Sequence, residues 1–200
     1  MSFAVILGLS IFLSVPYGIL SRMCGGGFVK LPYGLDQWLY AFPFAILGYL
    51  SIGWWGVLLA GIFAFLGKRT GHGQYMDLGS WTGIVKPERL DLIVKWFFGK
   101  DPNKTHQGAG SKVRDFFGLC VTGAFTALGA SIALALGGHL WLSLIVFLGG
   151  AAKGVAYLVG WDAWWPEMGH NLDEPTEVGE FFCGFFAGVP LFFSILWLLL

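Results

Sequence analysis

The chain has 200 residues, of which 56% are hydrophobic and only 12% are charged, and its mean hydropathy is +0.70. A soluble domain carries about 25% charged residues, so this composition excludes a soluble globule, and the abundant apolar surface excludes intrinsic disorder. Twelve basic and twelve acidic residues give a formal net charge of zero, which argues against a nucleic-acid partner. The composition predicts an all-α, polytopic transmembrane helical bundle.

The first half of the chain holds one clear span and one ambiguous uncharged run. A spanning helix needs about 20 mostly apolar residues. Residues 3–21 fit this length and lack the basic start of a cleaved signal, so we expect a retained span. The run from Gln37 to Gly67 has 31 residues without charge, with a turn signal at Ser51–Gly53. It fits either two helices, 33–51 and 54–70, or one strongly tilted span.

The second half predicts three further spans. Phe116 to Ala152 is 37 residues without an acidic or basic side chain, which is too long for one crossing. Gly137-Gly138-His139 interrupts the run near its middle. We therefore expect a hairpin of spans 114–136 and 140–159, followed by a last span at 178–200. All spans then belong to a single membrane domain, residues 1–200.

The distribution of positive charge favours six spans over five. Nine of the twelve Lys and Arg residues lie between Lys68 and Arg114, while Arg22 and Lys30 lie between the first two spans. Basic residues accumulate on the cytoplasmic side of a membrane. Six spans place all of these residues on that side, whereas five spans would separate them. The predicted cytoplasmic loops are 68–113 and 160–177, and both termini lie outside the cytoplasm.

An apparent internal repeat, 33–99 and 113–188, also favours six spans. Both segments carry Asp, Phe-Leu-Gly, a basic residue, Gly, Tyr, Asp, Trp, Pro and a Phe pair in this order, and the pair begins ten residues after the Pro in each. Residues 87–99 form an amphipathic helix of about 20 Å, too short to cross, so we expect it to lie in the membrane interface. The chain then crosses the membrane twice between matching positions of the two repeat units. The two units therefore have the same orientation in the membrane, which makes the predicted repeat parallel.

Small residues recur at four-residue spacing on the expected spans. Such spacing lets helix backbones approach closely in lipid, where packing drives helix association. The pattern predicts a compact bundle and allows self-association into a homo-oligomer. The positions are Ser10/Ser14/Gly18, Gly56/Ala60/Ala64, Gly123/Ala127/Ser131, Gly150/Gly154 and Gly184/Gly188.

The glycine-rich segment from Gly67 to Gly79 is a candidate site for anionic headgroups. Its glycines allow backbone N–H groups to approach an anion, and its basic side chains supply positive charge. The order of a P-loop is absent, and a basic helix end followed by a glycine turn explains the same residues. The candidate binding residues are Lys68, Arg69, His72 and Asp77.

Lys153 is the deepest charge expected in the membrane. A charge at that depth costs a few kcal/mol unless it pairs or snorkels. Glu180, near the start of the last span, is the natural partner, and Asp162 is another. The alternatives are a polar pathway through the bundle and a snorkelling lysine in a structural pair. The histidines and cysteines lack ligand spacing, so no metal, cofactor or catalytic residue is expected.

Two stretches carry a resemblance to a known family. GKRTGHGQYMDLG at 67–79 and KPERLD at 86–91, in a short glycine-rich multi-span chain, resemble small integral membrane proteins of unassigned activity from bacteriophage and prophage genomes. The resemblance implies residence in a bacterial host inner membrane with the basic loop in the cytoplasm. It brings no cofactor and no functional residue.

These patterns leave three functions open. The first is a non-enzymatic protein that binds membrane lipids, through their anionic headgroups, or a host membrane protein through its cytoplasmic face. The second is a small-solute or ion transporter or channel with Lys153 and Glu180 in the path. The third is a membrane-embedded lipid-modifying enzyme, in which Arg69, His72, Asp77 and Asp162 would converge. Transport predicts a polar cavity at mid-depth between the repeats, whereas the binding function predicts a solid bundle.

Overall fold

The computed structural model describes residues 2–25, 35–69, 109–159 and 177–200, and these residues form helices joined by turns. The described part of the chain is all-α, as the composition predicted. The amphipathic helix expected at 87–99 lies outside the described residues. The helices are α1 (Phe3–Gly25), α2 (Leu35–Ile52), α3 (Trp54–Arg69), α6 (Ala109–Leu136), α7 (Leu140–Ala151), α8 (Lys153–Val159) and α9 (Glu177–Leu199).

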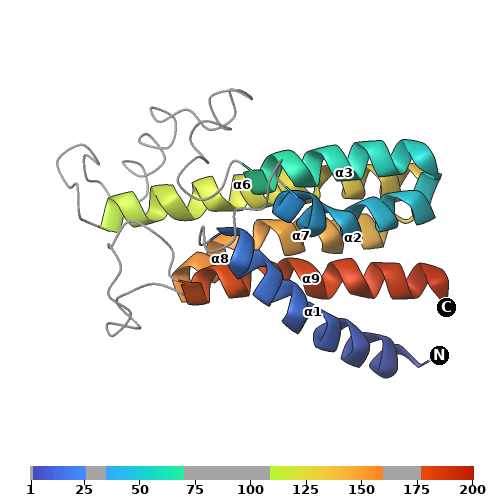
Figure 1. Ribbon diagram of the computed structural model, residues 1–200, viewed down its shortest axis with the longest axis horizontal. Coiled ribbons are helices and arrows are strands. Elements are labelled where there is room, and N and C mark those ends of the chain that lie inside the picture. Colours follow the sequence, from blue (N-terminus) through green and yellow to red (C-terminus); the bar gives the residue numbers. More distant parts are fainter. Residues whose placement is uncertain (1, 26–34, 70–108, 160–176) are drawn as a thin grey trace.

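The helices lie side by side in one elongated bundle (Figure 1). Helix α1 packs along α9, α2 packs along α3, and α6 packs along α7. Both chain termini lie at the end of the bundle where α2 turns into α3 and α6 turns into α7 (Figure 1). The two turns are adjacent, since a Cβ built on Gly137 would lie 2.8 Å from the carbonyl oxygen of Ser51. The predicted hairpins therefore share one end of the bundle.

A glycine in the left-handed region makes each of these turns. Gly53 has φ 68° and Gly138 has φ 84°, values that cost a residue with a Cβ about 1 kcal/mol or more. Gly53 separates α2 from α3, so the uncharged run 37–67 is two helices and not one tilted span. The parallel repeat stays a prediction, because parts of both of its halves lie outside the described residues.

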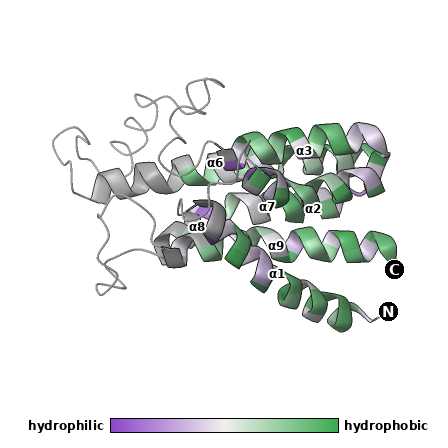
Figure 2. Ribbon diagram, viewed as in Figure 1, coloured by the Kyte–Doolittle hydropathy of each residue, from purple (hydrophilic) through white to green (hydrophobic). Residues whose placement is uncertain are grey.

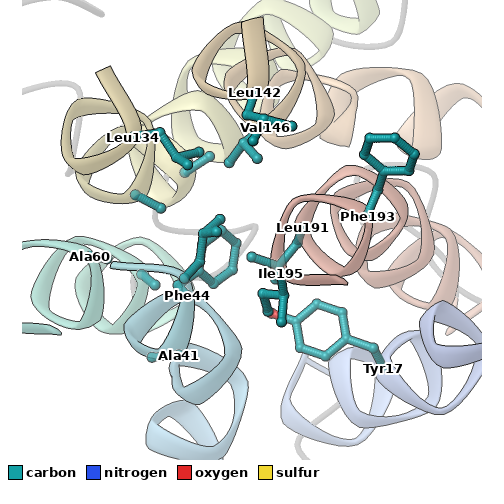
Figure 3. Packing of buried hydrophobic residues seen from close by; sticks show 14 of the residues in the cluster. Tyr17, Ala41, Phe44, Ala60, Leu134, Leu142, Val146, Leu191, Phe193 and Ile195 are labelled. Atoms are coloured by element: carbon teal, nitrogen blue, oxygen red, sulfur yellow. The ribbon is translucent and has the colours of Figure 1, made fainter. Parts of the chain in front are cut away.

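The core of the bundle is apolar and combines residues from most of the helices. Phe44, Leu134, Leu142 and Leu191 are each at most 1% exposed and meet at the centre of the bundle (Figure 3). They come from α2, α6, α7 and α9 respectively. These hairpins and the last helix therefore share one interior.

Hydrophobic residues run along the helices (Figure 2), and many of the large ones are exposed on the outside of the bundle. Phe12, Trp54, Trp55 and Leu140 are each more than 70% exposed, which is unfavourable in water for side chains of this size. In the described part of the chain, three helices are long and apolar enough to cross a membrane, and these are Phe3–Arg22, Leu119–Leu136 and Phe181–Leu199. Shorter apolar helices cover Gln37–Ile52, Trp54–Lys68 and Leu140–Ala156. An apolar exterior around such helices is typical of a membrane-embedded protein.

The predicted small-residue positions lie between helices, and every one of them is buried. A Cβ on Gly48 would collide with the carbonyl group of Gly56, and a Cβ on Gly123 would collide with the carbonyl group of Gly150. A Cβ on Gly184 would lie 2.8 Å from the carbonyl oxygen of Tyr17. These positions therefore bring backbones into contact, as the spacing predicted for a compact bundle.

The segment expected as one span at 140–159 contains one interruption. It consists of α7 and the seven-residue α8, with Ala152 between them. The chain direction continues across this break, because the Ala152 N–H donates to the Leu148 carbonyl and the Ala156 N–H to the Ala152 carbonyl, both at 2.9 Å. Gly149 and Gly150 precede the break, and glycine is the weakest ordinary helix former. The break makes Lys153 the first residue of α8.

Candidate functional site

A small cavity lies inside the bundle and is lined by every described helix. Its volume is about 20 Å³. A cavity needs on the order of 10–15 Å³ by this measure to hold one water molecule, so there is room for a water or one small ion. The lining residues are Ser21 on α1, Tyr40 and Phe44 on α2, Gly67 and Lys68 on α3, Gly123 and Thr126 on α6, Gly150 on α7, Lys153 on α8, and Cys183 and Ala187 on α9.

Lys68 reaches this cavity from the last turn of α3 and contacts two other helices. Its Nζ donates to the carbonyl oxygen of Ser21 at 3.1 Å and to the Ser21 Oγ at 3.0 Å. The same ammonium lies 4.8 Å from the ring centroid of Tyr40, which is within cation–π distance. Lys68 is thus held by α1 on one side and α2 on the other.

A second contact between α1 and α2 supports that arrangement. The Tyr17 hydroxyl donates to the carbonyl oxygen of Tyr40 at 2.8 Å. The two rings stack with centroids 4.8 Å apart and planes at 21°. Both tyrosines are buried, so packing and hydrogen bonding restrict their rotamers. The ring beneath Lys68 is therefore fixed before any ligand arrives.

Lys153, the first residue of α8, also lines the cavity. The residue is only 8% exposed. The thiol of Cys183, on α9, donates to the Lys153 carbonyl oxygen at 3.8 Å, and a Cβ on Gly123, on α6, would lie 2.7 Å from the Lys153 Cβ. Lys153 is thus packed between α6 and α9. A lysine at such a position is costly in a membrane and typically functional.

Hydroxyl groups complete the polar part of the wall. Thr126 Oγ1 donates to the Thr122 carbonyl at 2.9 Å, so the hydroxyl proton of Thr126 is used in a bond within α6 and does not point to a ligand. Ser21 is fully buried, and its Oγ accepts the bond from Lys68. Within the described residues, the hydroxyl proton of Ser21 has no acceptor. Buried donors of this kind normally find a partner, and a ligand in the cavity would supply one.

Three glycines lie where the helices around the cavity approach each other most closely. A Cβ on Gly67 would lie 2.8 Å from the Thr126 Cα, and a Cβ on Gly150 would lie 2.6 Å from the Ala127 Cβ. Gly123 meets the carbonyl group of Gly150 directly. These contacts join α3 to α6 and α6 to α7 with little space for side chains. The cavity is narrow because the backbones around it touch.

The structure brings together two lysines that the sequence assigned to different sites. The sequence predicted that Lys68 binds anionic headgroups and that Lys153 forms an intramembrane ion pair. Both residues line the same cavity. Arg69 is the last residue of α3, and position 180 is one helical turn before Cys183 on α9. The side chains of Arg69 and Glu180 lie outside the described part of the molecule. His72, Asp77 and Asp162 also lie outside it.

The sequence reasoning missed Ser21, Tyr40, Thr126 and Cys183. Ser21 follows the small-residue stripe Ser10/Ser14/Gly18 along α1, so extending that stripe by one turn would have found it. Tyr40 and Thr126 carry no comparable signal. Within the described residues, no group of three His, Cys, Asp or Glu side chains is placed to hold a metal ion.

No protein-family model, curated protein or solved structure matches this chain. The class of protein therefore follows from its composition and fold. It is an all-helical bundle with an apolar exterior and helices able to cross a membrane.

Proposed function

We propose that the protein is an integral membrane protein that binds a small anion between its helices and passes it across the bilayer. The observation that carries the proposal is the convergence of Lys68 and Lys153 on one interior cavity. Intramembrane lysines face bundle interiors and mark ion or substrate paths. Of the functions open from the sequence, transport is the one that requires a polar cavity, and this cavity lies nearer the end where α8 and α9 meet than the mid-depth position expected from the sequence.

The electrostatics of the cavity suit an anion. Among its described lining residues, both charged side chains are lysines, and the Ser21 hydroxyl adds a neutral donor. A unit anion about 4 Å from one ammonium gains about 4 kcal/mol at an effective dielectric constant of 20. Taking an anion out of water is costly, so several donors at one position are needed to offset it. The cavity supplies such donors from α1, α3 and α8.

The proposal retains an intramembrane partner for Lys153. Position 180 lies one turn before Cys183 on the helix whose thiol contacts Lys153. Residues three apart share a helix face, so the register favours a Lys153–Glu180 pair. A carboxylate and a free anion would then compete for the same ammonium. Anion entry would be coupled to release of Glu180, which gives the path an internal gate.

The orientation proposed for the protein follows the charge distribution. The basic loop 68–113 and the acidic loop 160–177 lie in the cytoplasm, and the membrane is a bacterial inner membrane, as the phage and prophage resemblance implies. The common end of the bundle supports this orientation, because both termini and both glycine turns lie there (Figure 1). The lysines line a cavity nearer the opposite end, where α1 and α3 end and α8 and α9 meet.

Binding of anionic lipid headgroups is the second candidate function. Lys68 and Arg69 are the last two residues of α3, at the start of the segment that holds nine of the twelve basic residues. Lysine and arginine at the membrane surface each contribute about 1 kcal/mol to binding of anionic lipids. In this function the basic side chains also bind an anion, but the anion is a lipid headgroup and not a free ion. A lipid-modifying activity rests on residues outside the described part and gains no support.

Reconstitution of the full-length protein tests the proposal. Proteoliposomes loaded with chloride should release it faster than protein-free vesicles, and phosphate-loaded vesicles are tested in parallel. Lys153→Met should reduce this flux at least tenfold, whereas Lys153→Arg, which keeps the charge, should retain part of it. Ser194→Ala is the control, because the Ser194 hydroxyl donates within α9 to the Pro190 carbonyl at 2.7 Å. No flux of either anion from wild-type protein would overturn the transport function.

The headgroup function predicts a different result. Protein purified in mild detergent should then retain anionic lipid, measured by native mass spectrometry, and Lys68→Met should lose it while Lys153→Met keeps it. Retention of anionic lipid without flux would favour the second candidate. Flux that depends on Lys153 without retained lipid would favour the first.

A further inference from the structure

We propose that the cavity selects a monatomic anion of halide type over tetrahedral oxyanions such as phosphate and sulfate. The inference rests on the proposed anion site and names its substrate class. Three features of the cavity lead to it: its volume, the backbone contacts that limit its expansion, and the arrangement of its donors.

The volume is the first constraint. At about 20 Å³, the cavity exceeds the roughly 10–15 Å³ that one water occupies by this measure, but falls short of two full waters. A halide ion is a single sphere close to this size. Phosphate and sulfate have five heavy atoms and need several times the volume. A halide therefore fits the described lining with little rearrangement, whereas an oxyanion would require the lining to widen.

The glycine contacts prevent easy expansion. Gly123 and Gly150 are in direct backbone contact between α6 and α7, and Gly67 lies against Thr126 between α3 and α6. Widening the cavity would require these backbones to separate and would leave unfilled space beside them. Protein interiors are close-packed, and such voids lose their contacts outright. The small volume is thus a property of the fold and not of one flexible side chain.

The donors are arranged for a spherical acceptor. Lysine ammoniums act as point charges, whereas bidentate recognition of oxyanions favours the planar fork of arginine. The described lining residues include two lysines and no arginine. The lysines and the Ser21 hydroxyl come from different helices, and the Ser21 Oγ already accepts a bond from the Lys68 ammonium. That bond polarises the hydroxyl and makes it a better donor to an anion.

Halide affinity should therefore depend on Ser21, and a substitution at this position leaves the net charge of the protein unchanged. Replacement by alanine removes the hydroxyl proton and one of the two bonds that hold Lys68, while the bond to the Ser21 carbonyl remains. Ser21→Thr restores a hydroxyl at the same position. Ser194→Ala serves again as the matched control, because Ser194 is also buried and its hydroxyl bonds within its own helix.

The test is an anion titration of the full-length protein in detergent at constant ionic strength, with gluconate as the background anion. The thermal midpoint of unfolding should rise with chloride or bromide, since a ligand that binds only the folded state stabilises it. The apparent dissociation constants for sulfate and phosphate should be at least tenfold weaker than for chloride. Ser21→Ala should weaken chloride at least fivefold, Ser21→Thr should recover part of this loss, and Ser194→Ala should match wild type.

The outcomes separate this inference from the proposed function. Sulfate or phosphate binding as tightly as chloride would overturn halide selectivity and leave an anion site in place. Chloride binding that is unchanged in Ser21→Ala would place the halide elsewhere and overturn the assignment to this cavity. Absence of stabilisation by every anion would overturn both.

Discussion

Lys68 on α3 donates two hydrogen bonds to Ser21 on α1, to the carbonyl oxygen at 3.1 Å and to Oγ at 3.0 Å. The two residues are 47 positions apart in the chain. Helix α1 packs chiefly along α9 and only weakly along α2, so this contact connects the first helix to the α2–α3 hairpin. It also holds one of the two lysines at the cavity. The same contact thus stabilises the bundle and orients the proposed anion site.

The first prediction concerns the stability provided by this contact. Lys68→Met should lower the free energy of unfolding by about 2–3 kcal/mol, because hydrogen bonds to charged groups contribute about 1.5–3 kcal/mol each and are not additive. Ser21→Ala should lower it by about 1 kcal/mol, since the carbonyl acceptor remains. Unfolding by denaturing detergent measures both values. The double variant should cost less than the sum, and strict additivity would show that the bond to Oγ contributes nothing.

The second prediction concerns the contact between α6 and α7. Gly150→Ala should destabilise the fold by about 1–3 kcal/mol, because the added Cβ would lie 2.6 Å from the Ala127 Cβ and would collide with Gly123. Gly8→Ala is the matched control, since nothing lies within 4 Å of a Cβ there. That substitution should be neutral or stabilise by up to about 1 kcal/mol. Equal effects of the two substitutions would contradict the packing argument.

The third prediction concerns the orientation in the membrane. Cys24, Cys120 and Cys183 are first replaced, and single cysteines are then introduced and labelled with a membrane-impermeant reagent. Ile52→Cys and His139→Cys should react from the same side, because they flank the adjacent turns at one end of the bundle. Cysteines at 104 and 170, in the predicted cytoplasmic loops, should react only from the other side. Labelling of 52 and 104 from one side would contradict the six-span arrangement.

The fourth prediction concerns the proposed Lys153–Glu180 pair. Lys153→Met should destabilise the protein by about 3–5 kcal/mol, because removing one partner leaves the other charge poorly compensated in a low-dielectric interior. Adding Glu180→Gln should restore part of that loss. The double-mutant cycle isolates the coupling free energy. A coupling near zero would show that the residues do not interact and would remove the gate from the proposed function.

Glu180→Gln alone provides a fifth prediction. If the carboxylate competes with the anion for Lys153, its removal should increase the apparent chloride affinity about tenfold. The anion titration described above measures this change. An unaltered or weaker affinity would show that Glu180 does not occupy the anion position.

Local chemistry determined much of the fold from the sequence alone. The turns at Gly53 and Gly138 were predictable because a glycine between apolar runs permits the positive φ that such a turn requires. The buried small-residue positions were predictable because helical spacing sets which residues share a face. The all-helical class followed from composition. Each of these properties depends on neighbours within a few residues.

The candidate site was decided by the tertiary structure. Lys68 and Lys153 are 85 positions apart, and no periodicity gives the distance between residues on separate helices. Their meeting depends on how α3 and α8 pack around α6, which is set by backbone contacts at Gly67, Gly123 and Gly150. The hydrogen bonds from Lys68 to Ser21 arise in the same way. Sequence patterns determine which faces are buried, whereas close packing among all the helices determines which buried groups meet.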